Sequence, residues 1–158
     1  MRPQISLFLT LVTLPSISHL PLSWHLVANR VPNVTPNILF VDDEAPIREM
    51  LSLYFSKKGY SVTTATCGRD AKALAAQGPF NLAILDMNLA GESGLDLLGF
   101  FKSNYPSLPV VVFTGMAADQ GLLEKALTGG ACGFMSKTEP LDKLFAEVNR
   151  HLLKAPAA

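Results

Sequence analysis

At 158 residues the chain is long enough for one domain with a sizeable core, and 49% of its residues are apolar. Its formal net charge is zero, without the excess of basic residues that is typical of a nucleic-acid-binding surface, so we expect no nucleic-acid partner. No apolar stretch is long enough to predict a membrane span, and we expect no membrane partner. Cys67 and Cys132 lack the spacing of a zinc or redox motif and are most simply interpreted as free thiols.

Residues 1–36 differ in composition from the rest of the chain. They contain five prolines and no acidic residue, and the apolar run 5–14 is about as long as the core of a signal peptide. No small-residue cleavage site follows, and Pro15 and Pro21 would break a continuing helix. We expect a disordered or weakly packed extension, or a wrongly assigned start, ahead of a domain at 37–155. A membrane-associating tail and a signal peptide are the less favoured alternatives.

From residue 37 onward, short apolar runs alternate with amphipathic segments. Such runs predict strands buried on both faces, as in a parallel sheet covered by helices. The predicted strands are residues 37–41, 61–65, 82–85, 110–114 and 133–136. The predicted helices are residues 46–58, 69–76, 94–103, 121–127 and a last helix from about residue 141. The alternation predicts an α/β fold, an open five-stranded parallel sheet with right-handed crossovers and helices on both faces.

Two of the predicted helices carry a full apolar stripe with helical spacing, which we expect to face the core. In the first helix the stripe is Ile47, Met50, Leu51, Tyr54 and Phe55. In the last helix it is Leu141, Leu144, Phe145, Val148 and Leu152. The segment 87–93, between the third strand and the third helix, is predicted to be a loop.

Polar residues follow four of the predicted strands at the points where the apolar runs end. They are the pair Asp42 and Asp43, then Asp86, Thr114 and Lys137. Because the carboxyl ends of parallel strands share one edge of a sheet, we expect these side chains to converge there. Three carboxylates suit a hard cation such as Mg²⁺, and with that cation Asp86 would stay ionised and attack phosphorus. Lys137 and Thr114 would then bind phosphoryl oxygens.

Each of these residues alone has an ordinary structural explanation. Asp43 or Glu44 would serve as the N-cap of the following helix, and Asp86 would be a turn residue. Thr114 would open a loop, and Lys137 would be a solvated charge. The occurrence of all of them at strand ends favours the phosphoryl-binding interpretation.

Four stretches of the sequence together resemble the receiver domain of two-component response regulators. They are ILFVDDE at 38–44, LAILDMNL at 82–89, FTG at 113–115 and FMSK at 134–137. The resemblance extends over about residues 37–153. It implies a flavodoxin-like fold with strand order 2-1-3-4-5 and a cytoplasmic protein.

The resemblance also implies a role for each matching residue of the acidic site. Asp42 and Asp43 would bind Mg²⁺ together with Asp86 and the backbone carbonyl of Asn88. Asp86 would accept a phosphoryl group from a sensor histidine kinase or a histidine phosphotransfer protein. The protein would thus be a self-catalysing phosphoacceptor and not an enzyme in the usual sense.

The remaining matches concern the switch and the lysine. Thr114 matches the family's switch hydroxyl, Phe134 the aromatic residue whose rotamer follows it, and Lys137 the phosphoryl-binding lysine. Without the resemblance, Phe134 on a buried strand would be interpreted as an ordinary core residue. The family usually has a proline joined through a cis peptide after this lysine, but here Thr138 follows and the proline is Pro140. A cis bond before a non-proline residue costs about 2.5–4 kcal/mol. Either that strain is retained to aim Lys137, or the loop differs locally.

We expect a stand-alone regulator, since the residues after Lys137 are all needed for the last helix. Phosphorylation would change its affinity for a downstream protein on the face formed by the fourth helix, the fifth strand and the fifth helix. One alternative is a pseudo-receiver that binds partners independently of phosphorylation. A phosphate-ester hydrolase is less favoured because Asn88 stands where that chemistry requires a second aspartate. A flavodoxin-type cofactor site is weaker still, since the acidic residues after the first strand would repel phosphate.

Met116 stands two residues after Thr114, and in the resembling family this position lies beside the path of the hydrolytic water. Because an apolar side chain cannot orient that water, we predict slow self-dephosphorylation. Replacing Met116 with Glu or Lys should shorten the lifetime of the phosphorylated protein, measured as loss of label after removal of the donor. An unchanged half-life would contradict this prediction.

Overall fold

The structure is a computed structural model that describes residues 35–115 and 120–153. Every described residue belongs to one compact unit, which begins at residue 35. The expectations for the extension up to residue 34 and for Met116 lie outside the described residues, and the division at 36 stays a prediction. Within the described residues, no helix has both the length and the apolar character that crossing a membrane requires.

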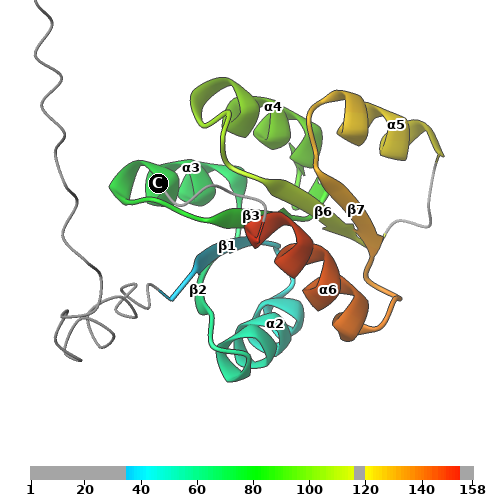
Figure 1. The fold of residues 1–158 in the computed structure, drawn as a ribbon. Helices are drawn as coiled ribbons and strands as arrows, with labels where there is room; N and C mark the ends of the chain where they lie inside the picture. Colours follow the sequence, from blue (N-terminus) through cyan, green and yellow to red (C-terminus); the bar gives the residue numbers. More distant parts are fainter. Residues whose placement is uncertain (1–34, 116–119, 154–158) are drawn as a thin grey trace, which may run out of the picture. The chain divides into compact units, whose positions relative to one another are not determined.

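Five parallel strands form one sheet in the order β2-β1-β3-β6-β7 (Figure 1). The strands are β1 (Asn37–Val41), β2 (Ser61–Ala65), β3 (Leu82–Leu85), β6 (Val110–Thr114) and β7 (Gly133–Ser136). Counting only these five strands along the chain, the order is 2-1-3-4-5, as predicted. The apolar runs, together with the β-branched segment 61–65, thus predicted the strand positions correctly.

Among the described residues, four helices connect the strands and a fifth follows β7, and together they cover both faces of the sheet (Figure 1). They are α2 (Ala45–Lys57), α3 (Gly68–Gln77), α4 (Gly94–Asn104), α5 (Gln120–Thr128) and α6 (Leu141–Leu152). Helices α2 and α6 lie on one face and α3, α4 and α5 on the other. The flavodoxin-like doubly wound fold is confirmed.

Two apolar clusters, one on each face of the sheet, form the core. Alternate residues of β1 belong to different clusters: Leu39 packs on the α3–α4–α5 side, whereas Phe40 packs on the α2–α6 side. Both are at most 1% exposed. A strand whose two faces are both covered must be apolar throughout, which explains the unbroken runs in the sequence.

The first helix differs from its predicted stripe at one position. Leu51 and Phe55 are buried, and Ile47 and Tyr54 are partly buried, but Met50 is 39% exposed. The buried side of α2 is therefore centred on the i, i+4 pair Leu51 and Phe55, and Met50 lies outside it. The expectation that Met50 belongs to the core was wrong.

The predicted loop 87–93 contains a small antiparallel hairpin made of β4 (Asn88–Leu89) and β5 (Glu92–Ser93). Ala90 and Gly91 at its tip have φ angles of 30° and 94°. Two residues with positive φ are the requirement of the tightest hairpin turns, which usually contain Asn-Gly or Asp-Gly. The Ala-Gly pair is a weaker signal, so sequence reasoning missed this hairpin.

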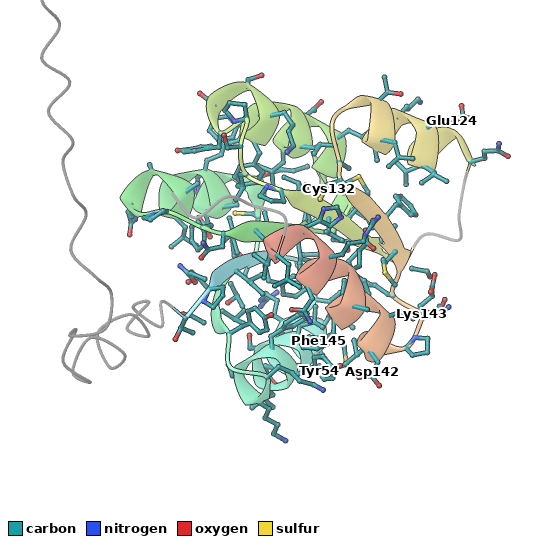
Figure 2. The ribbon with its side chains drawn as sticks, viewed as in Figure 1. Tyr54, Glu124, Cys132, Asp142, Lys143 and Phe145 are labelled. Atoms are coloured by element: carbon teal, nitrogen blue, oxygen red, sulfur yellow. The ribbon has the colours of Figure 1, made fainter. Side chains whose placement is uncertain are left out.

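An aromatic cluster joins α2, α6 and the residue that precedes β2 on the second face of the sheet. Tyr54, Phe55, Tyr60 and Phe145 pack with ring centroids 5.5–6.2 Å apart. The Tyr54 hydroxyl donates a 2.5 Å hydrogen bond to Asp142 at the start of α6 (Figure 2). Burial and this carboxylate raise the pKa of Tyr54 to about 12. These contacts fix α6 against α2.

Gly94 shapes the segment that follows β3. A Cβ atom at Gly94 would lie 2.5 Å from both the backbone oxygen of Asp86 and the Cα of Met87. The backbone N–H of Gly94 also donates a 3.1 Å hydrogen bond to the carbonyl of Met87. The start of α4 can approach the end of β3 this closely only because residue 94 has no side chain.

Replacing Gly94 with Ala should lower the free energy of unfolding by about 1–3 kcal/mol, because backbone atoms must move to admit the methyl group. Gly99 in the same helix is the matched control, since no atom lies within 4 Å of a Cβ built there. Gly99→Ala should leave stability unchanged or raise it, by up to about 1 kcal/mol, through helix propensity. Urea unfolding of both variants checks this, and equal midpoints would contradict it.

Candidate functional site

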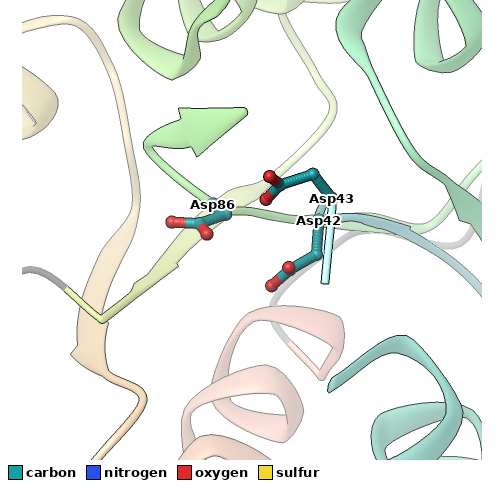
Figure 3. A group of neighbouring side chains, drawn as sticks. All are labelled: Asp42, Asp43 and Asp86. Atoms are coloured by element: carbon teal, nitrogen blue, oxygen red, sulfur yellow. The ribbon is translucent and has the colours of Figure 1, made fainter. Parts of the chain in front are cut away.

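The carboxyl edge of the sheet brings the predicted acidic residues together. Asp42 and Asp43 follow β1, Asp86 follows β3, and their carboxylates point toward a common space (Figure 3). One oxygen from each carboxylate lies within 4.8 Å of the others. Asp42 and Asp86 are buried, with 0% and 3% exposure, and Asp43 is less buried.

Backbone hydrogen bonds continue the sheet ladder into the site. The N–H of Asp42 donates to Ala65 on β2, and the N–H of Asp86 donates to Val41 on β1, at 3.1 and 2.9 Å. The N–H of Lys137 donates a 2.9 Å hydrogen bond to the carbonyl of Thr114. Because each of these residues comes directly after its strand, the register of the sheet fixes where its side chain begins.

Lys137 extends from the end of β7 to three carboxylates of the site. Its Nζ lies 2.6 Å from Asp86 Oδ2, 2.7 Å from Asp42 Oδ2 and 2.7 Å from Glu44 Oε1. Its side chain is only 9% exposed. Burial alone would lower the pKa of Lys137, but hydrogen bonds to these carboxylates raise it above its ordinary value. The ammonium is therefore charged and offsets part of the buried negative charge.

The two carboxylate oxygens of Asp42 differ in their hydrogen bonding. Oδ1 accepts a 2.9 Å hydrogen bond from the backbone N–H of Glu44. The buried Oδ2 is ion-paired with Lys137 but receives no well-aligned hydrogen bond from any described residue. Burial raises the pKa of Asp42, and the negative charge of Asp86 raises it further. The ammonium of Lys137 and the backbone N–H of Glu44 lower this pKa, but they offset only part of the increase. A buried carboxylate oxygen without a good donor fits a hard cation such as Mg²⁺.

Thr114 and Phe134 lie on neighbouring strands and point to the same face of the sheet. Phe134 pairs in register with Val112, and Thr114 is two residues further along β6. Because side chains two residues apart share a face, Thr114 and Phe134 are diagonal neighbours there. Thr114 is fully buried, whereas Phe134 is partly buried against the apolar cluster of α3, α4 and α5. Phe134 is therefore not among the ion-pair partners of Lys137 at the carboxyl edge of the sheet.

Two further predictions concern segments beside the site. The N–H of Asn88 donates a 3.3 Å hydrogen bond to Asp86 Oδ1, so Asn88 lies beside the acidic cluster. None of the described residues forms a cis peptide bond, so the Lys137–Thr138 bond is trans. The hydroxyls of Ser136 and Thr138 lie 2.7 Å apart in this loop. Of the two alternatives for this loop, the local difference is the one observed, and Lys137 still reaches the carboxylates.

Glu44 was predicted as a possible N-cap, but its contact with Lys137 and the role of Arg48 were not predicted from the sequence. Glu44 is the N-cap residue of α2, but its side chain makes no capping hydrogen bond and contacts Lys137. Arg48 Nη1 donates a 2.7 Å hydrogen bond to the backbone carbonyl of Asp42. The acidic residue directly after the Asp pair and the arginine one helical turn later were the available signals.

The family model of the response regulator receiver domain matches residues 38–149. Response regulator protein PilR of Pseudomonas aeruginosa is 34% identical over 106 residues, which cover 67% of this chain and 24% of PilR. Transcriptional regulatory protein KdpE of Mycobacterium tuberculosis is 31% identical over 121 residues, which cover 77% of this chain and 53% of KdpE. The chain thus spans about a quarter to a half of the length of these curated relatives.

Solved structures show the same architecture. A CheY-like receiver domain protein from Methanospirillum hungatei superposes with a TM-score of 0.72 at 25% identity, covering 77% of this chain and 96% of that one. Response regulator protein TrrA from Thermotoga maritima, solved in complex with Mg²⁺ and beryllofluoride, gives a TM-score of 0.68 at 28% identity, covering 74% and 99%. Since the family model spans most of the sequence and all five strand–helix units that build the site, the chain belongs to the family of response regulator receiver domains.

Proposed function

We propose that this receiver domain accepts a phosphoryl group on Asp86 from a histidine kinase or a histidine phosphotransfer protein. The observation that carries the proposal is the arrangement around Lys137, whose ammonium lies 2.6 Å from the buried Asp86 carboxylate beside two further aspartates. Phosphoryl transfer depends mostly on positioning and charge stabilisation, which this group of side chains supplies.

Asp42, Asp43 and Asp86, with the backbone carbonyl of Asn88, are the groups that would hold Mg²⁺. The cation supplies positive charge that lets the carboxylates stay ionised next to one another and next to an anionic phosphoryl group. The oxygen atom Oδ2 of Asp42, to which no residue in the described part of the chain donates a well-aligned hydrogen bond, supports this assignment. The TrrA structure contains Mg²⁺ with beryllofluoride, and we extend that ligand chemistry to this chain as part of the proposal.

In the transfer itself, a carboxylate oxygen of Asp86 forms a bond to phosphorus while the bond from phosphorus to the donor's leaving atom breaks. The leaving electron pair stays on the donor. The Lys137 ammonium neutralises charge on one phosphoryl oxygen, and the Thr114 hydroxyl donates a hydrogen bond to another. Because the protein itself carries the product, it acts as a substrate that assists its own modification.

We further propose that the phosphoryl group shifts a two-state equilibrium through Thr114 and Phe134. Their diagonal placement on one sheet face gives a direct route from the carboxyl edge to the surface near α5 and β7. A charge of about −1.5 to −2 added at Asp86 would favour the state in which Thr114 bonds the phosphoryl group. The face formed by α5, β7 and α6 would then bind a downstream protein with a different affinity. The stand-alone arrangement expected from the sequence stays a prediction.

Incubation with acetyl phosphate and Mg²⁺ should add one phosphoryl group to the wild-type protein, and Asp86→Asn should abolish this addition. Asp96→Asn, an exposed position on α4, is the matched control and should be labelled like wild type. Intact-protein mass spectrometry measures the label. An unlabelled wild type would favour the pseudo-receiver alternative, and a labelled Asp86→Asn variant would refute Asp86 as the acceptor.

Mg²⁺ should stabilise the protein because it binds the folded acidic cluster and not the unfolded chain. The gain in unfolding free energy should be about 2.7 kcal/mol when free Mg²⁺ is about 100 times its dissociation constant. Asp43→Asn should remove most of this gain, whereas Asp96→Asn should retain it. Thermal unfolding with and without Mg²⁺ tests this, and an equal gain in both variants would contradict the proposed metal ligands.

A further inference from the structure

Lys137 has a partner that the proposed transfer does not use. Besides Asp42 and Asp86, its Nζ lies 2.7 Å from Glu44 Oε1, and Lys137 donates a hydrogen bond to this oxygen. An ammonium group has three N–H donors and no acceptor. Lys137 donates hydrogen bonds to Glu44 Oε1 and Asp86 Oδ2, and the ion-paired Asp42 Oδ2 also lies 2.7 Å from Nζ, so three carboxylate oxygens surround the ammonium. An incoming phosphoryl oxygen that takes over a hydrogen bond of Lys137 therefore displaces one of these carboxylate oxygens.

Burial identifies the oxygen that leaves. The side chains of Asp42 and Asp86 are 0% and 4% exposed, whereas that of Glu44 is 58% exposed. Unless a cation takes the place of its ammonium, separating Lys137 from a buried carboxylate would leave an unpaired charge away from water, which is strongly unfavourable. An exposed carboxylate regains water when it separates, and such ion pairs contribute little to stability. Glu44 is therefore the partner that can exchange.

The backbone at Glu44 permits this exchange without moving the site. Its N–H donates to Asp42 Oδ1 and its carbonyl accepts the N–H of Arg48, so both sides of the residue are fixed. Its side chain makes no capping hydrogen bond to α2. The carboxylate can thus swing into water while the main chain around Asp42 stays in place.

We propose that Glu44 is a positioning residue that holds Lys137 in the unphosphorylated protein and competes with a phosphoryl oxygen for it. The inference rests on the proposed function and adds a determinant of how tightly the site binds a phosphoryl group. No covalent bond changes in the exchange: one N–H of Lys137 passes from Glu44 Oε1 to a phosphoryl oxygen, and the freed carboxylate is hydrated. Glu44 also brings a negative charge close to the anionic group that arrives.

The test is a titration of the full chain with beryllofluoride in Mg²⁺, followed by NMR of the backbone amides. Glu44→Gln keeps the size of the side chain but removes the competing charge, so it should bind beryllofluoride about three to ten times more tightly than wild type. Glu49→Gln is the matched control, since Glu49 is exposed on the same helix and is not among the three ion-pair partners of Lys137. Its affinity should stay within about twofold of wild type.

A second variant separates competition from simple charge repulsion. Glu44→Asp keeps the charge on a side chain one methylene shorter, which cannot reach Lys137 as well, so it should also bind beryllofluoride more tightly than wild type. Far-UV circular dichroism and thermal unfolding confirm that both variants fold.

Three outcomes would overturn the inference. If Glu44→Gln binds no more tightly than Glu49→Gln, only general charge is involved. If it binds more weakly, Glu44 is needed to aim Lys137 and does not compete. If Glu44→Asp binds like wild type while Glu44→Gln binds more tightly, repulsion and not release of Lys137 is the cause. In all three cases wild type binds beryllofluoride. A wild type that does not bind it in Mg²⁺ would instead refute the proposed function and this inference together.

Discussion

One buried ammonium group makes the acidic edge of this sheet possible. Asp42 and Asp86 are almost completely buried, and two carboxylates at close range would be strongly unfavourable without a compensating charge. Lys137 supplies that charge from β7, although β6 lies between β7 and β3 in the sheet. Its side chain crosses the end of β6 beside Gly115, where an added Cβ atom would lie 3.6 Å from Lys137 Cδ. The strand order therefore matters chemically, because it sets the distance that the lysine must span.

The same constraint connects the site to the rest of the molecule. The N–H of Lys137 is bonded to the carbonyl of Thr114, so the lysine and the buried hydroxyl residue are fixed to each other. Phe134 lies diagonally across from Thr114 on the same face, at the boundary of the apolar cluster. Lys137, Thr114 and Phe134 are thus connected to one another through β6 and β7.

The strands and the residues at their ends could be predicted from sequence because burial on both faces leaves a strong pattern. The run before Asp86 is apolar throughout, and the position of Asp86 follows from the end of that run. The contact between the Glu44 side chain and Lys137 could not be predicted. The spacing of residues in the sequence indicates where the backbone at Glu44 lies, but not in which direction its long side chain points. The exposure of Met50 has a similar cause: a stripe of apolar residues can be wider than the face that a helix buries.

The central claim is that phosphorus becomes attached to the side chain of Asp86. Borohydride reduces an aspartyl phosphate to homoserine, which remains in the peptide and can be located by sequencing mass spectrometry. After treatment with acetyl phosphate and Mg²⁺, the account predicts homoserine at position 86, and none there when Mg²⁺ is removed with a chelator. Homoserine at another aspartate, or at position 86 to the same extent without Mg²⁺, would contradict it.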